Sequence, residues 1–362
     1  MSPQMKKMEK IGLKTIKRQG QPYSYSINDF FEPVQQLKTA FSNLIEAEDP
    51  ERIAIIPSAS YGLANVANNL RLKEGDQILV VDEQFPSNIY PWLNEAVKNG
   101  ATVEVVQAPK NRENRGAVWN QRILEAINDR TKMVAIGHVH WADGTLFDLV
   151  AIRAKAWDYN ALLVIDGTQS VGALPFSIKE IQPDALICGG YKWLMGPYSL
   201  GVAYYGSYFD GGDPIEENWI NRLNSHDFTA LVNYQPFYRP KANRYSVGEQ
   251  SNFILVPLLL TAIEQLLEWK VDNIQAYCKK ITTKAIQELL DLDLSLEKEA
   301  YRSPHLFGIQ LNAAIKPDLL KKNLEEAKVF VSFRGDSLRV GPNVYNEAKD
   351  LTKLLQCLKK SF

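Results

Sequence analysis

Short apolar runs recur between about residues 50 and 206 and are separated by segments of helical length. The runs are rich in Val, Ile and Leu and read RIAIIPS, QILVVD, TVEVVQAP, MVAIGHVH, ALLVIDG, ALICGG and LGVAYYG. Strands that are apolar along their whole length, and that are joined by helices, are typical of a parallel sheet buried on both faces. The pattern therefore predicts an α/β sandwich over this part of the chain.

The alternation stops after this region. Residues 207–250 are rich in Gly, Pro and aromatic side chains, which predicts long surface loops. Beyond them, apolar periodicity predicts helices at about 253–270 and 272–291, a strand in LFGIQL and a closing helix. One face of the closing helix carries Leu351, Leu354, Leu355 and Leu358. We expect a smaller α/β domain here.

Length and pattern together predict two domains. A chain of 362 residues exceeds the usual size of a single domain. We expect a large domain over residues 20–250 and a small domain built from 1–19 and 251–362.

The charge balance argues against two classes of partner. Lys and Arg number 41 against 42 Asp and Glu, so no global field attracts the chain to nucleic acid or to an anionic membrane.

The most apolar segment, 253–267, contains Pro257 and Glu264 and is shorter than the roughly 20 residues that a spanning helix needs. No apolar stretch of signal-peptide length follows the basic N-terminus. We expect a small polar or zwitterionic ligand.

Cysteine and histidine usage points to neither disulfides nor a metal. Cys188, Cys278 and Cys357 lie far apart and have no zinc-site or disulfide spacing, which fits a reducing, cytoplasmic setting. His138 and His140 form a close pair, but without a carboxylate or cysteine partner the pair is a weak metal signal. Packing in the core or a cleft is the favoured interpretation, and no metal is expected.

Polar residues that follow two of the apolar runs carry candidate chemistry. Ligands of a parallel sheet bind beyond the carboxyl ends of its strands. Asp166 ends one run and Gln169 follows it, and Lys192 lies in a Gly-rich turn after another run. Alone, Asp166 could be a helix cap, a metal ligand or a ribose contact, and Lys192 could be a solvated loop residue.

Together, Asp166 and Lys192 match what pyridoxal 5'-phosphate (PLP) needs from a protein. A partly desolvated lysine has a lowered pKa and can form a Schiff base, while a carboxylate keeps the pyridine nitrogen protonated. Gln169 could hydrogen-bond the phenolic oxygen of the ring. A phosphate would suit the strand-to-helix turn of IIPSASYGLANV, where Ser60 and free backbone N–H groups lie at a helix start, although this turn could equally be a plain capped helix.

These motifs resemble, in order and over about residues 50–360, the class V aminotransferase family of fold-type I PLP enzymes, which includes cysteine desulfurases and isopenicillin N epimerase-like proteins. The resemblance implies a large domain with a seven-stranded, mainly parallel sheet between helices, and a smaller C-terminal α/β domain. It also implies a homodimer whose PLP sites lie at the subunit interface. MSPQM resembles the middle of an N-terminal substrate-lining segment, which implies further residues upstream.

The resemblance also assigns individual residues. Ala59 and Ser60 match the phosphate binder, and Phe85 matches the aromatic residue stacked on the cofactor, where relatives often have histidine. Trp141 stands where relatives place a residue near the phenolic oxygen, and it could offer its indole N–H or only line the pocket. The resemblance assigns Tyr191 and Ser251 as phosphate contacts, and Ser251 would contact the phosphate of the neighbouring subunit. It assigns Arg339 as the anchor of the substrate carboxylate, with Arg334 as the alternative anchor.

These residues limit the possible reaction classes but do not identify a single reaction. Residues 328–339, which precede the anchor, contain no cysteine, so a desulfurase that uses its own thiol is not expected. An aminotransferase is the favoured interpretation, and a lyase or epimerase of the same family is the alternative. A nucleotide-binding protein is disfavoured because no G-x-G-x-x-G or P-loop motif follows an early strand. A non-catalytic binding protein of this fold also remains open, given the departures at Phe85, Trp141 and Glu249.

Overall fold

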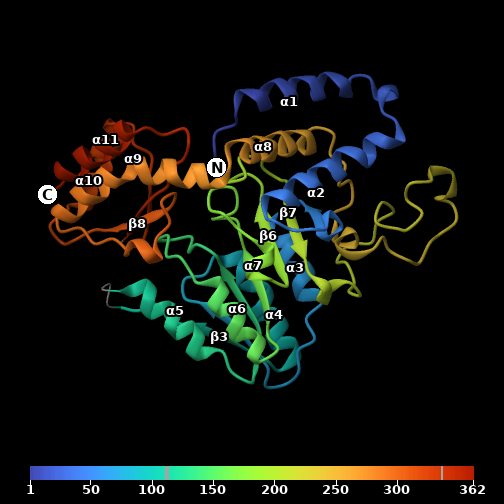
Figure 1. Cartoon of the computed structure of the whole chain (residues 1–362), viewed down its shortest axis with the longest axis horizontal. Coiled ribbons are helices and arrows are strands. Elements are labelled where there is room, and N and C mark those ends of the chain that lie inside the picture. Colours follow the sequence, from blue (N-terminus) through green and yellow to red (C-terminus); the bar gives the residue numbers. More distant parts are fainter. Residues whose placement is uncertain (111–113, 336) are drawn as a thin grey trace.

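A seven-stranded sheet forms the centre of the larger part of the molecule (Figure 1). The computed structural model describes residues 1–110, 114–335 and 337–362. The strands lie in the order β1-β7-β6-β5-β4-β2-β3. Their bounds are β1 Ile53–Ile56, β2 Gln77–Val81, β3 Thr102–Val106, β4 Thr131–Gly137, β5 Leu162–Asp166, β6 Ala185–Gly189 and β7 Gly201–Tyr205. Each of the apolar runs noted in the sequence forms one of these strands.

Strand directions explain why the sequence reads as a parallel sheet. β2 pairs in parallel with β3 and β4, and β4 with β5 and β5 with β6 are also parallel. Only β7 runs the other way, antiparallel to both β1 and β6. Along β1, Ile53 and Ile55 enter one buried cluster while Ala54 and Ile56 enter the other. Because both faces are covered, every position of the strand is apolar.

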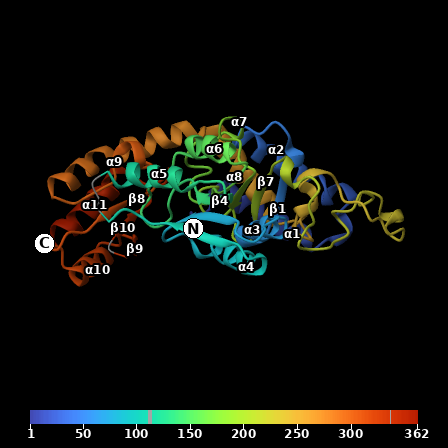
Figure 2. The same ribbon diagram turned by 90° about the horizontal axis from the view of Figure 1, so that it is seen from below.

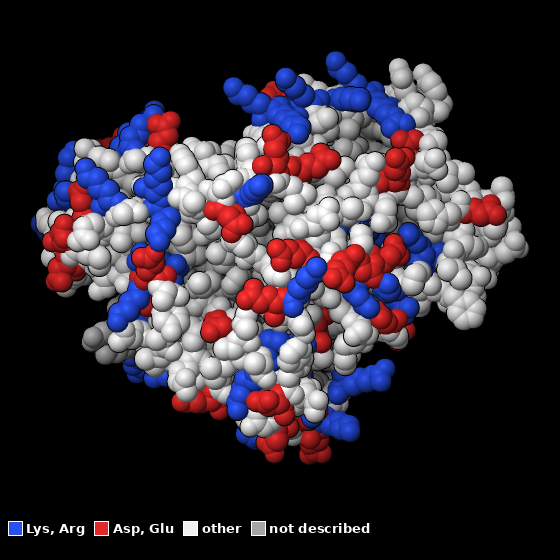
Figure 3. Space-filling model, viewed as in Figure 1, with Lys and Arg blue, Asp and Glu red and all other residues white. Residues whose placement is uncertain are grey.

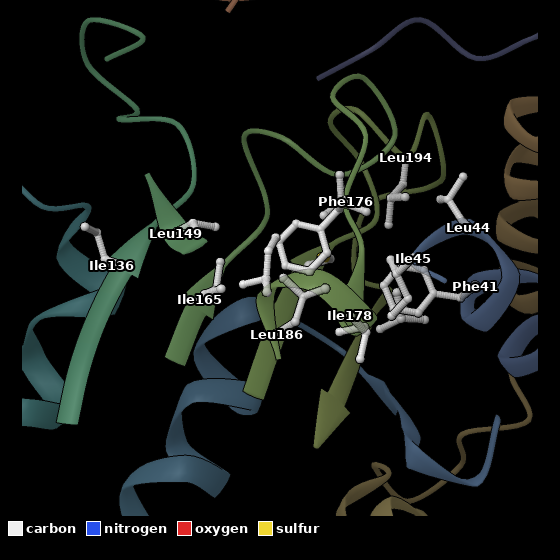
Figure 4. Packing of buried hydrophobic residues seen from close by; sticks show 14 of the residues in the cluster. Phe41, Leu44, Ile45, Ile136, Leu149, Ile165, Phe176, Ile178, Leu186 and Leu194 are labelled. Carbon is white, nitrogen blue, oxygen red and sulfur yellow. The ribbon is translucent and has the colours of Figure 1, made fainter. Parts of the chain in front are cut away.

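Helices cover both faces of this sheet (Figure 2). One face packs against side chains such as Leu63 of α3 and Trp92 of α4. The other packs against α2, α5, α6, α7 and α8, and Figure 4 shows Phe41 and Leu44 of α2 in this cluster with Ile165 and Leu186 of the sheet. The bounds are α2 Glu32–Leu44, α3 Ala59–Asn68, α4 Tyr90–Asn99, α5 Arg115–Ala126, α6 Leu149–Asp158, α7 Ile178–Ile181 and α8 Leu255–Trp269.

The C-terminal part contains a second, smaller sheet with the strand order β8-β10-β9, antiparallel throughout. Its elements are α9 Val271–Asp291, β8 Phe307–Gln310, α10 Pro317–Glu326, β9 Ser332–Arg334, β10 Ser337–Val340 and α11 Ala348–Lys359. The four leucines expected on one face of the closing helix are all buried in the core of this part. The expected helices and the LFGIQL strand are confirmed, whereas β9 and β10 had no clear signal in the sequence.

Two further segments complete the chain. Residues 207–250 hold only short 3-10 turns between loops, as expected, and part of this segment projects from the right of Figure 1. Helix α1 (Lys6–Gln19) packs on α8 through Met8, Leu258 and Ala262. Lys and Arg side chains gather along α1 in Figure 3, whereas both signs of charge mix over the rest of that face. The domain boundaries at 20 and 250 stay a prediction.

Among the residues that the structure describes, no helix combines the length and the apolar character needed to cross a membrane.

Candidate active site

The predicted site residues of the large sheet follow strands that end at the same edge. β1, β2, β4, β5 and β6 all point one way, so their carboxyl ends lie side by side. These ends are followed in turn by Ala59 and Ser60, by Phe85, by Trp141, by Asp166 and Gln169, and by Tyr191 and Lys192. The topology therefore brings together residues that the chain separates by more than a hundred positions, as expected for a ligand site of a parallel sheet.

Lys192 is the centre of this edge. It lines a cavity of about 650 Å³ together with Gln169, Trp193 and Arg339. Its Nζ lies 5.4 Å from the ring centroid of Phe85 and 5.7 Å from that of Tyr191. The pKa of Lys192 is lowered, mainly by burial, and the positive charges of Arg339 and Arg334 lower it further, while Asp166 opposes the shift. An amine in this state gives up its proton more easily and can attack a carbonyl carbon.

A glycine permits the turn that presents Lys192. Gly190 follows β6, its N–H donates to Leu200 O, and Gly196 N–H donates back to Gly190 O. A Cβ atom at Gly190 would lie 2.5 Å from Leu200 O, which is closer than any side chain tolerates. The close approach of the two backbone segments therefore requires glycine at this position.

Asp166 is the last residue of β5, and Gln169 lies in the turn that follows this strand. Asp166 Oδ1 accepts a hydrogen bond from Thr168 N at 3.0 Å, and its charge acts on both Lys192 and Tyr191. Gln169 is largely buried, and its Oε1 accepts a hydrogen bond from Trp193 Nε1 at 3.1 Å. Both residues therefore lie near Lys192, and their roles toward a cofactor stay a prediction.

Trp141 directs its N–H group to the main chain and packs its ring against Phe85. Its Nε1 donates to Glu83 O at 2.6 Å, so the indole N–H is directed to the main chain. The ring makes an edge contact with Phe85, with centroids 5.4 Å apart and an interplanar angle of 79°. The N–H group is therefore taken by the main chain, and the role of Trp141 toward a cofactor stays a prediction.

Two arginines from the smaller sheet converge on Trp141. Arg339 of β10 is partly buried, and its Nη1 donates to Trp141 O at 2.6 Å. The Cζ of Arg334, on β9, lies 5.3 Å from the Trp141 ring centroid. Burial lowers the pKa of Arg339, and the positive charge of Arg334 adds to this effect. Two neighbouring guanidinium groups favour an anionic group such as a carboxylate.

The residues predicted to contact phosphate lie in three separate segments of the chain. Ala59 and Ser60 are the first residues of α3, where backbone N–H groups lack partners within the helix, and Ser58 caps the helix by accepting from Tyr61 N at 3.2 Å. Tyr191 packs against Tyr198 with ring centroids 4.7 Å apart. Ser251 is buried, and its hydroxyl donates to Phe30 O within the same chain. The phosphate role of each of these residues stays a prediction.

The two histidines of the close pair, His138 and His140, have different surroundings. His140 Nδ1 lies 3.0 Å from Asp143 Oδ1, and its Nε2 lies 3.3 Å from Asp82 O. His138 borders a second cavity, and burial together with His305 lowers its pKa to about 3. Within residues 1–110, 114–335 and 337–362, no group of three or more His, Cys, Asp and Glu side chains could hold a metal ion.

The sequence interpretation missed two residues beside the site. Trp193 contacts Gln169 through the hydrogen bond described above, and its ring packs edge-on against His305 with centroids 4.6 Å apart. His305 is fully buried and lies in the C-terminal part of the chain. The position of Trp193 directly after the lysine was a usable signal, because a buried indole N–H normally requires an acceptor. His305 carried no such signal, since its partner is distant in the sequence.

The residues present fit PLP. A desolvated lysine lies over an aromatic ring, and the adjacent strand ends in a carboxylate and is followed by an amide. The helix start that a phosphate needs follows another strand of the same sheet. Arg339 lines the same cavity as Lys192, and its role as the anchor of a substrate carboxylate stays a prediction.

Related sequences cover most of the chain. The family model described as Aminotransferase class-V matches residues 20–352. YcbU, an uncharacterised aminotransferase of Bacillus subtilis, is 26% identical over 348 residues, which cover 91% of this chain and 88% of that protein. A probable cysteine desulfurase of Pyrococcus abyssi is 30% identical over 308 residues, which cover 82% of this chain and 72% of that protein.

Solved structures share the fold. A cystine C-S lyase in complex with its product cysteine persulfide has a TM-score of 0.85 at 19% identity, with 98% of this chain and 94% of that chain covered. The cysteine desulfurase CsdA of Escherichia coli has a TM-score of 0.79 at 18% identity, with 97% and 91% covered. The expected fold, family and cofactor are thereby confirmed. Because the family model spans nearly the whole chain, the protein belongs to the class V aminotransferase family of PLP-dependent enzymes.

Proposed function

We propose that the protein holds PLP as a Schiff base on Lys192 and acts as an aminotransferase on an amino acid. The observation that supports this proposal is the position of Lys192, whose amine is desolvated, lines a large cavity and lies over the face of Phe85. When bound, PLP supplies a carbonyl carbon for amines and a ring that accepts electrons from the substrate.

The protein's own residues would have distinct tasks. Lys192 holds the cofactor and then moves a proton at the substrate α-carbon, for which its lowered pKa is suited. Asp166 would place a negative charge near the ring nitrogen and so keep it protonated, and Phe85 would pack on the face of the ring. Arg339 binds the substrate carboxylate through a planar fork of N–H groups, which fixes the orientation of the bond that breaks.

Transamination is favoured by relatives that match along their length. The Bacillus subtilis relative and a relative of Schizosaccharomyces pombe each match 91% of this chain, and both are named as aminotransferases. A lyase or epimerase is the second candidate, and the fold shared with a cystine C-S lyase supports the lyase.

A desulfurase that uses its own thiol is not proposed. Cys188 is buried in β6, Cys278 in α9 and Cys357 in α11. Burial raises the pKa of all three thiols, which disfavours the nucleophilic thiolate.

Trapping by borohydride tests the attachment of the cofactor. The wild type with PLP should show a visible absorbance band that borohydride bleaches, and mass spectrometry should then find the cofactor on the peptide that contains residue 192. Lys192→Ala should show neither result. Absence of a band in the wild type after PLP is added would overturn the proposal.

Product analysis separates the two candidate reactions. An aminotransferase converts an amino acid to its keto acid, keeps the nitrogen on the cofactor until a second keto acid accepts it as an amino group, and releases no ammonia. A β-lyase releases ammonia, pyruvate and the β-substituent in each turnover, and an epimerase exchanges the α-proton with solvent without forming a keto acid. Ammonia in proportion to pyruvate would replace the first candidate with the second.

We further propose a cytoplasmic homodimer. Three free, buried cysteines support a reducing setting. Val232, Tyr234 and Phe237, in the projecting loop region, are 79%, 96% and 66% exposed, and such apolar side chains favour burial against a second copy. Light scattering at micromolar concentration should give twice the mass of one chain, whereas a monomer would contradict this proposal.

A further inference from the structure

Gln169 is held at both its main chain and its side chain, and only one end of its amide is left for the cavity. Its Oε1 accepts from Trp193 Nε1 at 3.1 Å, and its main-chain oxygen accepts from His305 Nε2 at 2.8 Å. Among the described residues, the Nε2 of Gln169 has no acceptor, and Gln169 lines the cavity that contains Lys192. We propose that Trp193 is a positioning residue that fixes the Gln169 amide so that only its N–H groups face the cofactor.

The chemistry of the indole decides which way the amide points. The oxygen and nitrogen of a glutamine side chain are normally interchangeable in position, so its orientation must come from its partners. A Trp side chain can only donate a hydrogen bond. If the amide were reversed, two donors would face each other in a buried place, which leaves both unsatisfied. Trp193 therefore selects the orientation with Oε1 toward itself and Nε2 toward the cavity.

His305 secures the main chain of the same residue. Burial lowers its pKa to about 4, so the ring is neutral at physiological pH. Because Gln169 O accepts from Nε2, the proton of the neutral ring lies on Nε2, and Nδ1 accepts from Gln275 Nε2 at 3.0 Å. Gln275 belongs to α9. The smaller part of the molecule thus supports Gln169 through His305, while Trp193 supports it from the lysine turn.

The consequence concerns the phenolic oxygen of the cofactor. This step rests on the proposed function, in which PLP is held on Lys192. A donor at that oxygen stabilises negative charge on it and so favours loss of the proton that it shares with the nitrogen of the lysine link. The Gln169 amide would therefore act as a dedicated donor, and its donor character would depend on the Trp193 N–H group, 24 residues further along the chain.

Spectroscopic titration of the holoenzyme tests this dependence. The visible band of the lysine-linked cofactor changes with pH. The pH at the midpoint of this change reports loss of the proton that the phenolic oxygen shares with the lysine nitrogen. In Gln169→Leu the midpoint should rise by about half a unit to one unit, as expected for one lost hydrogen bond. In Trp193→Phe it should rise by a smaller amount in the same direction. In the double variant the shift should equal that of Gln169→Leu alone, because Trp193 acts only through Gln169.

A matched control and an isosteric variant separate this role from packing. Trp119→Phe also removes a buried indole hydrogen bond, from Nε1 to Val106 O at 3.0 Å, but away from Gln169, and it should lower thermal stability without moving the midpoint. If Trp193→Phe does not fold, β-(3-benzothienyl)alanine at position 193 keeps the shape of the indole and replaces only the N–H group by sulfur. It should give the same upward shift.

The outcomes distinguish this inference from the proposed function. An unchanged midpoint in folded Trp193→Phe or in the isosteric variant, while wild type shows the lysine-linked band, would overturn the inference alone. Shifts of Trp193→Phe and Gln169→Leu that simply add would also overturn it, since Trp193 would then act without Gln169. Absence of the band in wild type would instead overturn the proposed attachment to Lys192.

Discussion

Lys192 and Lys38 are both withdrawn from water, and burial lowers the pKa of each. Lys38 lies on α2, is 1% exposed and has a pKa of about 7. Its Nζ donates to Asn243 Oδ1 at 2.7 Å, and Asn243 in turn donates to Glu51 at 2.6 Å. The Nζ of Lys192 instead lies over the ring of Phe85 and borders a cavity of about 650 Å³.

The difference shows that a lowered pKa does not identify a reactive lysine. A nucleophilic amine needs an available lone pair and space for the carbonyl group that it attacks. Lys38 also borders a cavity, of about 300 Å³, but its side chain is almost wholly covered and its amine is held by an amide oxygen. Geometry and access distinguish the two lysines, and desolvation alone does not.

The largest expected effect concerns covalent trapping. In Lys38→Met, borohydride should still fix PLP to the peptide that contains residue 192, to the same extent as in wild type. In Lys192→Ala, no peptide should carry the cofactor, and activity should fall by a factor of about 1,000 or more, because the general base is lost together with the attachment. Peptide mass spectrometry measures the first result. Cofactor on residue 38 in either protein would break the comparison.

The next effect is on stability and follows from the pKa of Lys38. Its folded pKa of about 7 lies below the value of about 10.4 expected in the unfolded chain. Between these values the unfolded chain binds a proton that the folded chain does not, so the free energy of unfolding should rise with pH. The slope is on the order of 1 kcal/mol per pH unit from this residue, and below pH 7 its contribution to the slope vanishes.

Urea unfolding of the protein without PLP at several pH values between 7 and 10 measures this slope. Lys38→Met should remove the rise, and the same change at the exposed Lys14 should leave it intact. Parallel stability curves for wild type and Lys38→Met would show that Lys38 titrates normally.

A smaller effect is expected from the arginine that faces Lys192. Arg339→Gln should lower kcat/KM for the amino acid by a factor of about 10 to 100, the range for one lost charged hydrogen bond, while trapping of PLP on Lys192 is retained. Arg339→Lys should recover little, because an ammonium group cannot form the paired contact. Steady-state kinetics measures both variants. A larger loss in Arg334→Gln than in Arg339→Gln would transfer the anchor role to Arg334.

The smallest effect is expected at the aromatic ring under Lys192. Phe85→Leu should weaken binding of PLP by a factor of about 2 to 10, since stacking contributes about 0.5 to 1.5 kcal/mol beyond the area it buries. Equilibrium dialysis with Lys192→Ala as the background isolates stacking from covalent attachment. Phe362→Leu, at the far end of the chain, serves as the control, and equal affinities in the two variants would remove Phe85 from the cofactor site.

The sequence by itself determined the large sheet and the place of its chemistry. Short, mainly apolar runs separated by segments of helical length predicted the strands β1 to β7 without knowledge of contacts, although β3, at the edge of the sheet, is mostly exposed. Asp166 and Lys192 could be assigned to one edge of the sheet because parallel strands end together. Both conclusions rest on local sequence patterns, which can be recognised before the tertiary packing of the chain is known.

Only the tertiary structure decided the partners of these groups. Arg339 and Trp141 are 198 residues apart, and Lys38 and Asn243 are 205 residues apart, so neither pair leaves a periodic signal. Hydrogen-bonding partners that meet only after folding set the direction of the Trp141 N–H group and the orientation of the Gln169 amide. They also determine why the Lys38 amine is held by an amide oxygen while the Lys192 amine borders a cavity. Hydrogen bonds act over about 3 Å, and distances on that scale between remote residues are set by the packing of the whole chain.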